Sequence, residues 1–206
     1  ALKDDGKKNP LIIWLHGLSE GGDDIDLDLL GNEVTALTRD EIQQQFTTEG
    51  GSNGSYVLAF QSPTYWMHAA DGATFDGSAD SIYRDVLTKG IQDYVKKNKD
   101  VDPSRVYIGG CSNGGYMTMN LLVHDDENFF AAAYPVCEAY ADSALSADDI
   151  AKLAKKNIWF VQSANDAVVK PNQYGEKTYT RLLTAGAQNC WYSMYEKVLG
   201  TDAEGK

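Results

Sequence analysis

The sequence predicts a three-layer α/β/α sandwich built on a mostly parallel sheet. Short apolar runs typical of buried strands alternate along the chain with segments whose apolar residues recur at helical spacing. Helical segments of this kind act as crossover connections, which join parallel strands of one sheet. With 206 residues, 43% of them apolar, the chain can bury one substantial core, so we expect a single domain over residues 1–206.

Each expected strand is a short apolar run closed by residues that favour turns. The first, 11–15, ends at His16-Gly17, and the second, 56–60, is closed by Ser62-Pro63. The remaining strands are expected at 105–109, 131–136, 158–162 and 190–195. The glycine- and serine-rich stretch 50–55 is expected to be a surface loop.

The expected helices follow from apolar spacing and from capping residues. One starts at Ser81 and runs for about five turns, with apolar residues recurring at Ile82, Val86, Leu87, Ile91, Tyr94 and Val95. Others are expected at 113–124, 147–156 and 173–184. Ser146 is the expected N-cap of the third, because Asp149 follows it at nearly the spacing of a capping box.

Charge and composition exclude several classes of function. The formal net charge is −12, and such a surface repels phosphate backbones and anionic lipids, so we expect no nucleic-acid or membrane partner. No apolar run approaches the roughly 18 residues of a membrane span, and no signal peptide is visible. The three cysteines and three histidines show no metal-ligand spacing, so no metal or cofactor is expected.

The strongest motif is Gly110-Cys111-Ser112-Asn113-Gly114, which matches G-x-S-x-G. A predicted strand precedes it and a predicted helix follows it. In that context the serine occupies a sharp turn that projects its hydroxyl above the sheet. Glycine on either side is required because a β-carbon next to the strained serine would not fit. The motif therefore predicts Ser112 as a nucleophile.

Residues 102–117, DPSRVYIGGCSNGGYM, resemble the nucleophile block of secreted α/β-hydrolase serine esterases. These esterases are the poly(hydroxybutyrate)-depolymerase-like and feruloyl-esterase-like (carbohydrate esterase) proteins. Residues 15–17, 133–137 and 165–169 resemble the same group at the expected intervals, so the resemblance covers about residues 10–197. It implies the α/β-hydrolase fold and hydrolysis of carboxylic esters through an acyl-serine intermediate.

An acyl-transfer site also needs two amide donors for the tetrahedral oxyanion. One is expected to be the N–H of Asn113, the residue after the nucleophile. The resemblance places the other in the loop after the first strand, at Leu18, with Ser19 as the alternative. His16 is expected to brace this loop rather than to act as a base.

The resemblance, together with its place just after the strand 158–162, makes Asp166 the acid of the triad. Asp142, Asp148 and Asp149 are weaker candidates. No histidine follows Asp166, and this is the main departure from the family pattern. Relatives carry that histidine beyond the stretch resembling 195–206 and begin with strands upstream of Pro10. We therefore expect the chain to lack its extreme N- and C-terminal parts.

Besides His16 the sequence contains two other histidines, and one of them is considered as a substitute for the missing base. His124 follows the predicted nucleophile helix beside acidic residues and is expected on the surface. His68 is the weaker possibility of a substitute base, since it precedes the serine in the chain. Without a base, attack by the serine should be slower by several orders of magnitude.

Five side chains are candidates for the walls of a substrate cleft: Tyr65, Trp66, Glu138 and Tyr140, which follow strand ends, and Tyr116, which starts the predicted nucleophile helix. Aromatic walls would suit an aromatic acyl group, a sugar ring or a polyester segment, although aromatics at strand ends fill cores as often. Cys111 and Cys137 end neighbouring strands, and as in an exported enzyme we expect them to form a disulfide. Cys190 is expected to be a buried free thiol.

The chain is therefore expected to be a secreted serine esterase without metal or cofactor. Its partner would be a small-molecule or polymeric ester, such as a short-chain, cell-wall or polyester acyl ester. A serine peptidase of the prolyl-oligopeptidase type is an alternative, although 206 residues leave no room for its propeller domain. An inactive hydrolase-like module that binds carbohydrate or protein is the alternative outside enzymes.

Overall fold

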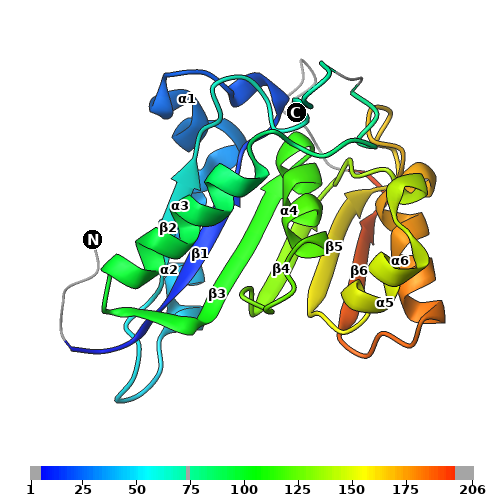
Figure 1. The fold of residues 1–206 in the computed structure, drawn as a ribbon. Helices are drawn as coiled ribbons and strands as arrows, with labels where there is room; N and C mark the ends of the chain where they lie inside the picture. Colours follow the sequence, from blue (N-terminus) through cyan, green and yellow to red (C-terminus); the bar gives the residue numbers. More distant parts are fainter. Residues whose placement is uncertain (1–5, 73–74, 198–206) are drawn as a thin grey trace.

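The computed structural model of the chain describes residues 6–72 and 75–197. Six parallel strands form one sheet in the order β2-β1-β3-β4-β5-β6 (Figure 1). Their bounds are β1 Asn9–Leu15, β2 Tyr56–Phe60, β3 Val101–Cys111, β4 Ala132–Val136, β5 Ile158–Ser163 and β6 Cys190–Tyr195. All six expected strands are confirmed, and the two at 56–60 and 190–195 have the expected bounds.

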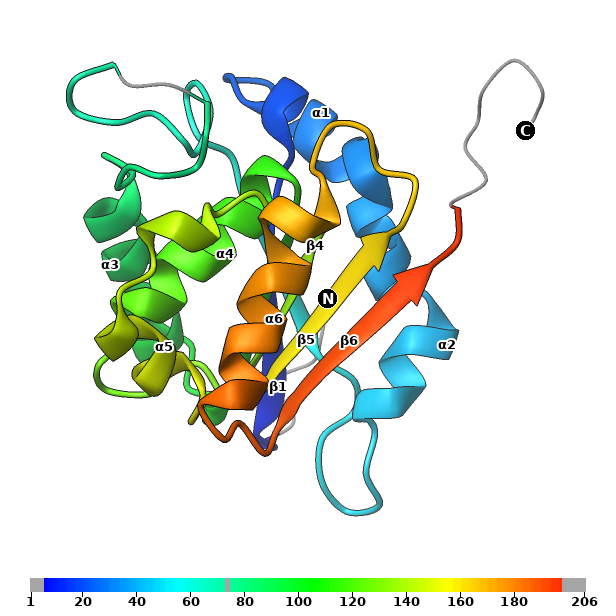
Figure 2. The same ribbon diagram turned by 90° about the vertical axis from the view of Figure 1, so that its right-hand side faces the viewer.

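Helices cover both faces of the sheet and make three layers (Figure 2). One face carries α3 Arg84–Lys97, α4 Asn113–Val123, α5 Ala147–Leu153 and α6 Gly175–Thr184. The other carries α1 Ile25–Leu30, the 3₁₀ segment Gly31–Thr38 and α2 Asp40–Gln43. The three-layer α/β/α prediction is thereby confirmed.

The centre of the core lies where β1 and β3 meet α4. Every residue of β1 is buried, as is every residue of α4. A parallel strand covered on both faces has no solvent side, which explains why β1 is a continuous apolar run instead of an alternating one. Helix α4 is therefore fixed along its whole length, and its first turn follows the G-x-S-x-G motif.

The structure differs from the expected helices in three main places, and α6 also begins at Gly175 instead of Gln173. Helix α3 begins at Arg84 instead of Ser81, because the Ser81 hydroxyl accepts a hydrogen bond from the Tyr83 N–H and forms a turn there. Helix α5 ends at Leu153, although Ser146 and Asp149 form its expected capping box. Residues 18–46, for which no element was expected, form the short helical segments of the second face.

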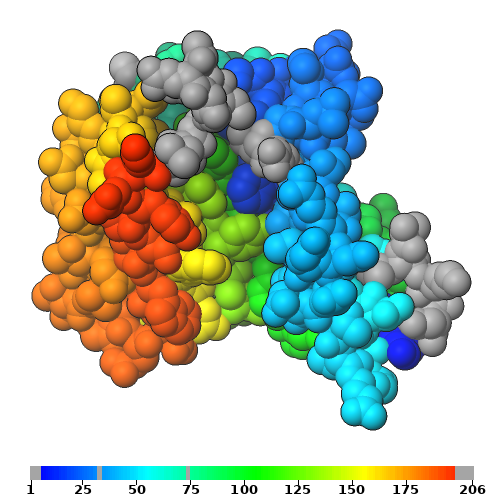
Figure 3. Space-filling view, turned by 180° about the vertical axis from the view of Figure 1, so that it is seen from behind, coloured from blue at the N-terminus to red at the C-terminus, as the bar shows by residue number. Residues whose placement is uncertain are grey.

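A wide concavity lies mainly on the face of the sheet that carries α2. It is a groove of about 780 Å³ between strands β3–β6 and the α2 region, visible as the hollow in Figure 3. Tyr134, Trp159 and Trp191 line it from the sheet, and Ile42 and Phe46 line it from the other side. Neither Ser112 nor Asp166 borders this groove, so its size does not make it the candidate active site.

The described residues lack two further classes of feature. Within residues 6–72 and 75–197, no helix combines the length and apolar character needed to cross a bilayer. The same residues contain no group of three or more His, Cys, Asp or Glu side chains arranged to hold a metal ion.

Candidate active site

Ser112 stands at the turn between β3 and α4, with φ 57° and ψ −109°. A non-glycine residue with positive φ is strained, and such strain marks functional turns. The Ser112 N–H donates a hydrogen bond to the Val136 carbonyl at 2.9 Å, which ties the turn to the end of β4. The side chain is half-buried and so remains accessible. The expected strand-to-helix turn is confirmed.

Close backbone contacts explain the glycines around the serine. A β-carbon on Gly114 would lie 1.9 Å from the Leu15 carbonyl oxygen, and one on Gly115 would lie 2.7 Å from the Glu138 Cα. A β-carbon on Gly110 would lie 2.6 Å from the same Leu15 oxygen. These neighbours are main-chain atoms that cannot move aside. The glycines therefore let α4 start directly against the ends of β1 and β4.

The same contacts bring the loop after β1 beside the serine. In the β1–β3 register Leu15 pairs with Gly110, so the residues that follow each strand leave the sheet together. Leu18 and Asn113 are each the first residue of a helical segment, where the N–H has no partner within the helix. The sheet edge thus carries two amides that could donate to a substrate oxygen.

His16 braces this loop through both ring nitrogens. Its Nδ1 lies 2.6 Å from the Gly17 carbonyl and donates to it, while Nε2 accepts from the Ser62 N–H at 3.0 Å. Burial lowers the pKa of His16, so the ring is neutral and satisfied. This arrangement leaves His16 no free nitrogen with which to act as a base.

Asp166 lies in the turn after β5 with its carboxylate held from two sides. Oδ1 accepts from the N–H groups of Val168 and Val169 at 2.9 and 2.8 Å, and Oδ2 lies 3.3 Å from Gln162 Nε2. In the sheet register Cys111, the residue before Ser112, pairs with Val136 of β4, and Val136 pairs with Val161 of β5, so Asp166 follows a strand two places from the serine turn at the same sheet edge. Asp166 also lines a cavity of about 320 Å³ at the ends of β4, β5 and β6.

The alternative acids have other partners. Asp142 is buried and forms ion pairs with Arg181 at 2.9 Å and Lys177 at 3.2 Å, and Asp149 accepts from the N–H of Ser146 in the capping box. Asp148 lies in the exposed first turn of α5. Of the candidate acids, Asp166 is therefore the one at the sheet edge that carries the strand-to-helix turn at Ser112, here called the elbow.

The described histidines make their contacts away from Ser112 and Asp166. His68 contacts the Thr64 hydroxyl through Nδ1 and stacks on Tyr65. His124 donates from Nδ1 to the Asn120 carbonyl and accepts from Arg84 through Nε2. As a group, the three histidines of the chain have roles in bracing loops and helix ends.

Four of the five expected cleft residues are buried, and this corrects the expectation for them. Trp66, Tyr116, Glu138 and Tyr140 have exposed fractions of 2%, 0%, 1% and 6%. Tyr116 stacks on Tyr140 with ring centroids 5.5 Å apart, and Trp66 packs on the His16 ring. These side chains therefore pack beneath the site. Tyr65 keeps partial exposure and stays a candidate for substrate contact.

Glu138 is a carboxyl group with few partners. Its Oε2 accepts from the Tyr140 N–H at 2.7 Å, while Oε1 is buried without a hydrogen-bond partner among the described residues. Burial raises the pKa of Glu138 to about 8. At neutral pH it is therefore mostly a neutral acid packed against the first turn of α4, where Gly115 makes room for it.

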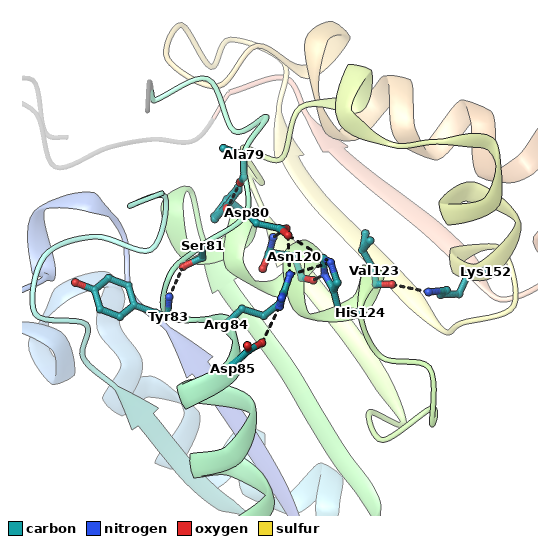
Figure 4. Close-up of polar contacts among 11 residues, drawn as sticks. Ala79, Asp80, Ser81, Tyr83, Arg84, Asp85, Asn120, Val123, His124 and Lys152 are labelled. Carbon is teal, nitrogen blue, oxygen red and sulfur yellow. Dashed lines mark hydrogen bonds and ion pairs between the residues drawn. The ribbon is translucent and has the colours of Figure 1, made fainter. Parts of the chain in front are cut away.

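Polar contacts that were not among the expectations from the sequence hold the loop between β2 and α3 over α4. Asp80 accepts from Asn120 Nδ2 at 2.9 Å and pairs with Arg84 at 2.7 Å, and Arg84 in turn contacts His124 (Figure 4). The Tyr116 hydroxyl donates to the Ala79 carbonyl. The i,i+4 spacing of Asp80 and Arg84 was the one sequence signal for this network.

Cys111 and Cys137 lie at the ends of adjacent strands, as expected, but their sulfur atoms are 3.5 Å apart. A disulfide requires about 2.05 Å, so the structure contains two free thiols here. Hydrogen bonds from Cys111 and from the Ser112 N–H lower the pKa of Cys137, while the pKa of Cys111 is raised by its contact with Cys137 and by burial. Cys190 is free and buried, as expected, and burial raises its pKa to about 11.

Comparison with known structures places this geometry among hydrolases. A thermostable esterase matches with a TM-score of 0.77 and 25% identity over 95% of this chain. The chain has the α/β-hydrolase fold. This α/β-hydrolase chain spans about half of that esterase, 48% of its length. A ferulic acid esterase shares the fold with a TM-score of 0.63 at 14% identity, over 95% of this chain and 80% of that one.

Peptidases share the same fold. An acylaminoacyl peptidase of Pyrococcus horikoshii matches with a TM-score of 0.59 and 17% identity, over 96% of this chain and 34% of that one. The sequence model described as the prolyl oligopeptidase family matches residues 80–148 of this α/β-hydrolase chain. That segment includes α3, β3 and the serine turn.

Proposed function

We propose that the protein hydrolyses carboxylic esters through an acyl-enzyme intermediate on Ser112. The observation that carries the proposal is the position of this half-buried serine. Its backbone is strained at φ 57°, glycines flank its turn, and the carboxylate of Asp166 lies at the same sheet edge. A serine in such a turn has its hydroxyl presented to a substrate above the sheet.

In the proposed reaction the Ser112 Oγ attacks the ester carbonyl carbon, and the amides of Leu18 and Asn113 donate to the oxygen that becomes negative. The alkoxide leaves with the proton that Ser112 gave up, and water then hydrolyses the acyl-serine ester. Asp166 would orient the histidine that carries this proton. We propose that this histidine comes from outside the described residues, since the similar esterase is about twice as long as the match.

The substrates we propose are short-chain, cell-wall or polyester acyl esters. The cavity beside Asp166, about 320 Å³ with mostly apolar walls from Val136, Val161 and Tyr195, would accept a small acyl or alcohol group. The esterases with the same fold support an ester as the substrate. No metal or cofactor enters the proposed mechanism.

We also propose that the protein is exported and that Cys111 and Cys137 form a disulfide there. Their 3.5 Å separation needs only a small closing movement, and the pair lies on neighbouring strands. Disulfides of this kind persist in oxidising compartments. A bridge beside Ser112 would restrict the movement of the serine turn.

One observation favours a second candidate, a serine peptidase. The prolyl oligopeptidase family matches residues 80–148, and acylaminoacyl peptidases share the fold. Esters and peptides use the same nucleophile and oxyanion donors, so the geometry near Ser112 fits both. The leaving group, an alcohol or an amine, is what the experiment must distinguish.

The test compares two substrates in the full gene product that contains this chain. Wild type and Ser112→Ala are assayed on p-nitrophenyl acetate and on an N-acylated peptide p-nitroanilide. The proposal expects Ser112-dependent hydrolysis of the ester with much slower cleavage of the anilide. Faster cleavage of the anilide would support the peptidase. Equal rates of ester hydrolysis in wild type and Ser112→Ala, or no hydrolysis by either, would contradict both the esterase and the peptidase proposals and would support a binding module.

A further inference from the structure

Glu20 lies in the loop after β1, in the 3₁₀ turn Leu18–Glu20. Its Oε2 accepts a hydrogen bond from the backbone N–H of Gly17 at 2.6 Å. A hydrogen bond to an ionised carboxylate is about twice as strong as one between neutral groups. The Gly17 N–H therefore donates to Glu20 instead of to a ligand. The next amide along the chain, that of Leu18, remains available to donate to a ligand.

The surroundings hold the Glu20 carboxylate in this position. A β-carbon on Gly31 would lie 2.3 Å from Oε1, so the glycine at the end of α1 makes the space that the carboxylate fills. Gln61, just after β2, donates from Nε2 to the Glu20 carbonyl at 2.9 Å. Asp28 of α1 is fully buried beside it, and its pKa is raised to about 7, first by burial and then by the Glu20 charge.

Glu20 also lies close to the serine turn. Its charge contributes to the raised pKa of Cys111, the residue before Ser112. The β1–β3 register and the contact of Gly114 with the carbonyls of Leu15 and His16 join the Glu20 loop to that turn. A displacement of the loop at Gly17 would therefore alter the geometry at the site of the proposed reaction.

We propose that Glu20 is a positioning residue of the oxyanion loop. By binding the Gly17 N–H it fixes Gly17 at φ −72° and ψ −176°, and thereby sets the direction of the Leu18 N–H toward the substrate oxygen. The inference rests on the proposed function and adds to it a residue that does not touch the substrate. It predicts that the Gly17 hydrogen bond is needed for transition-state stabilisation but not for substrate binding.

The first test separates kcat from KM on p-nitrophenyl acetate in the full gene product. Glu20→Ala should lower kcat about 10- to 100-fold with little change in KM, since loss of an oxyanion donor costs about 100- to 1000-fold and here the donor is displaced instead of removed. Glu20→Gln should retain most of the activity, because its amide oxygen can still accept from Gly17. Asp26→Ala, an exposed acid on neighbouring α1, is the matched control and should match wild type.

The second test measures the stability of the Gly17 hydrogen bond independently of catalysis. The Gly17 amide, followed by NMR hydrogen exchange, should be protected in wild type and in Glu20→Gln. Gly31→Ala, whose β-carbon would push on Oε1, should reduce that protection and lower kcat in the same direction as Glu20→Ala. It serves as the informative variant if Glu20→Ala does not fold.

The outcomes separate the two proposals. Ser112-dependent ester hydrolysis with unchanged kcat in Glu20→Ala, or in Gly31→Ala if Glu20→Ala does not fold, overturns the role of Glu20 and leaves the esterase proposal standing. An equal loss of kcat in Glu20→Gln and Glu20→Ala also overturns it, because the acceptor is present in one and absent in the other. Absence of any Ser112-dependent hydrolysis overturns the proposed function and with it the assignment of Glu20.

Discussion

The side-chain oxygen Oδ1 of Asn113 accepts a hydrogen bond from the backbone N–H of Trp66 at 2.6 Å, and both residues are buried. Asn113 therefore has two functions in the account. Its own N–H is proposed to face the substrate, while its side chain fixes the loop that follows β2. This single residue couples the serine turn to the loop that carries Tyr65.

Asn113→Ala should lower the free energy of unfolding by about 1–3 kcal/mol, because the buried Trp66 N–H loses its acceptor. It should also lower kcat by loosening the loop. Urea denaturation of the purified protein measures the first effect. Gln188→Ala is the control, since Gln188 is exposed and donates only to the nearby Gly186 carbonyl. Equal unfolding free energies for Asn113→Ala and wild type would contradict the role of the hydrogen bond.

Two glycines within helices should respond in opposite directions to alanine. Gly115→Ala places a β-carbon 2.7 Å from the Glu138 backbone and should cost about 1–3 kcal/mol of stability through overpacking. Gly90→Ala, in α3, meets only the Phe60 ring at 3.4 Å and should be neutral or stabilising by up to about 1 kcal/mol. Thermal unfolding of the two variants measures the contrast. A Gly115→Ala variant as stable as wild type would show that the elbow is less tightly packed than described.

Glu138 makes stability depend on pH. Burial raises its pKa from 4.5 to about 8, so between these values the folded state keeps a proton that the unfolded chain has lost. The stabilisation of the folded state that is linked to this proton is complete below pH 4.5, decreases as pH rises, and is lost once pH passes 8. The unfolding free energy of Glu138→Gln minus that of wild type should therefore be larger at pH 8.5 than at pH 4.5. The gain should be at least about 1.4 kcal/mol, one pKa unit.

Urea denaturation at both pH values tests the Glu138 prediction. Glu41→Gln, an exposed acid of α2, is the control and should show the wild-type dependence. A Glu138→Gln curve parallel to wild type at the two pH values would mean that the carboxyl is solvated or paired in solution.

The thiols beside the serine can be tested directly. If Cys111 and Cys137 are joined in the exported protein, alkylation of the native, unreduced protein should label neither, and a reductant should make both available. Peptide mass spectrometry reads this out, with Cys190 as an internal thiol that is free in both states. Free alkylation of Cys111 and Cys137 without reductant would remove the disulfide proposal.

The strands, the sheet class and the serine turn could be predicted because their signals are local. A buried parallel strand is a continuous apolar run, and the turn before α4 needs its glycines at fixed positions. Residues 18–46 could not be predicted, since 3₁₀ turns and helices of four to six residues are too short to show apolar periodicity.

The aromatic residues at strand ends show a different limit. Tyr116 and Tyr140 were expected at a cleft, but they stack on each other in the core. Tyr140 lies beyond the end of β4, where the two-residue alternation no longer fixes the direction of a side chain, and Tyr116 lies in α4, which is buried along its whole length. The Glu20–Gly17 contact had a usable signal, because Glu20 follows Gly17 at the three-residue spacing of a capping box.

Chemical labelling can identify the nucleophile directly. The full gene product is treated with a fluorophosphonate, which forms a stable adduct with an activated serine, and the adduct is located by peptide mass spectrometry. If Ser112 is the nucleophile, a single adduct forms on Ser112, is absent from Ser112→Ala, and appears in step with the loss of esterase activity. An adduct on another serine, or ester hydrolysis that continues with Ser112 unmodified, would contradict the assignment of Ser112.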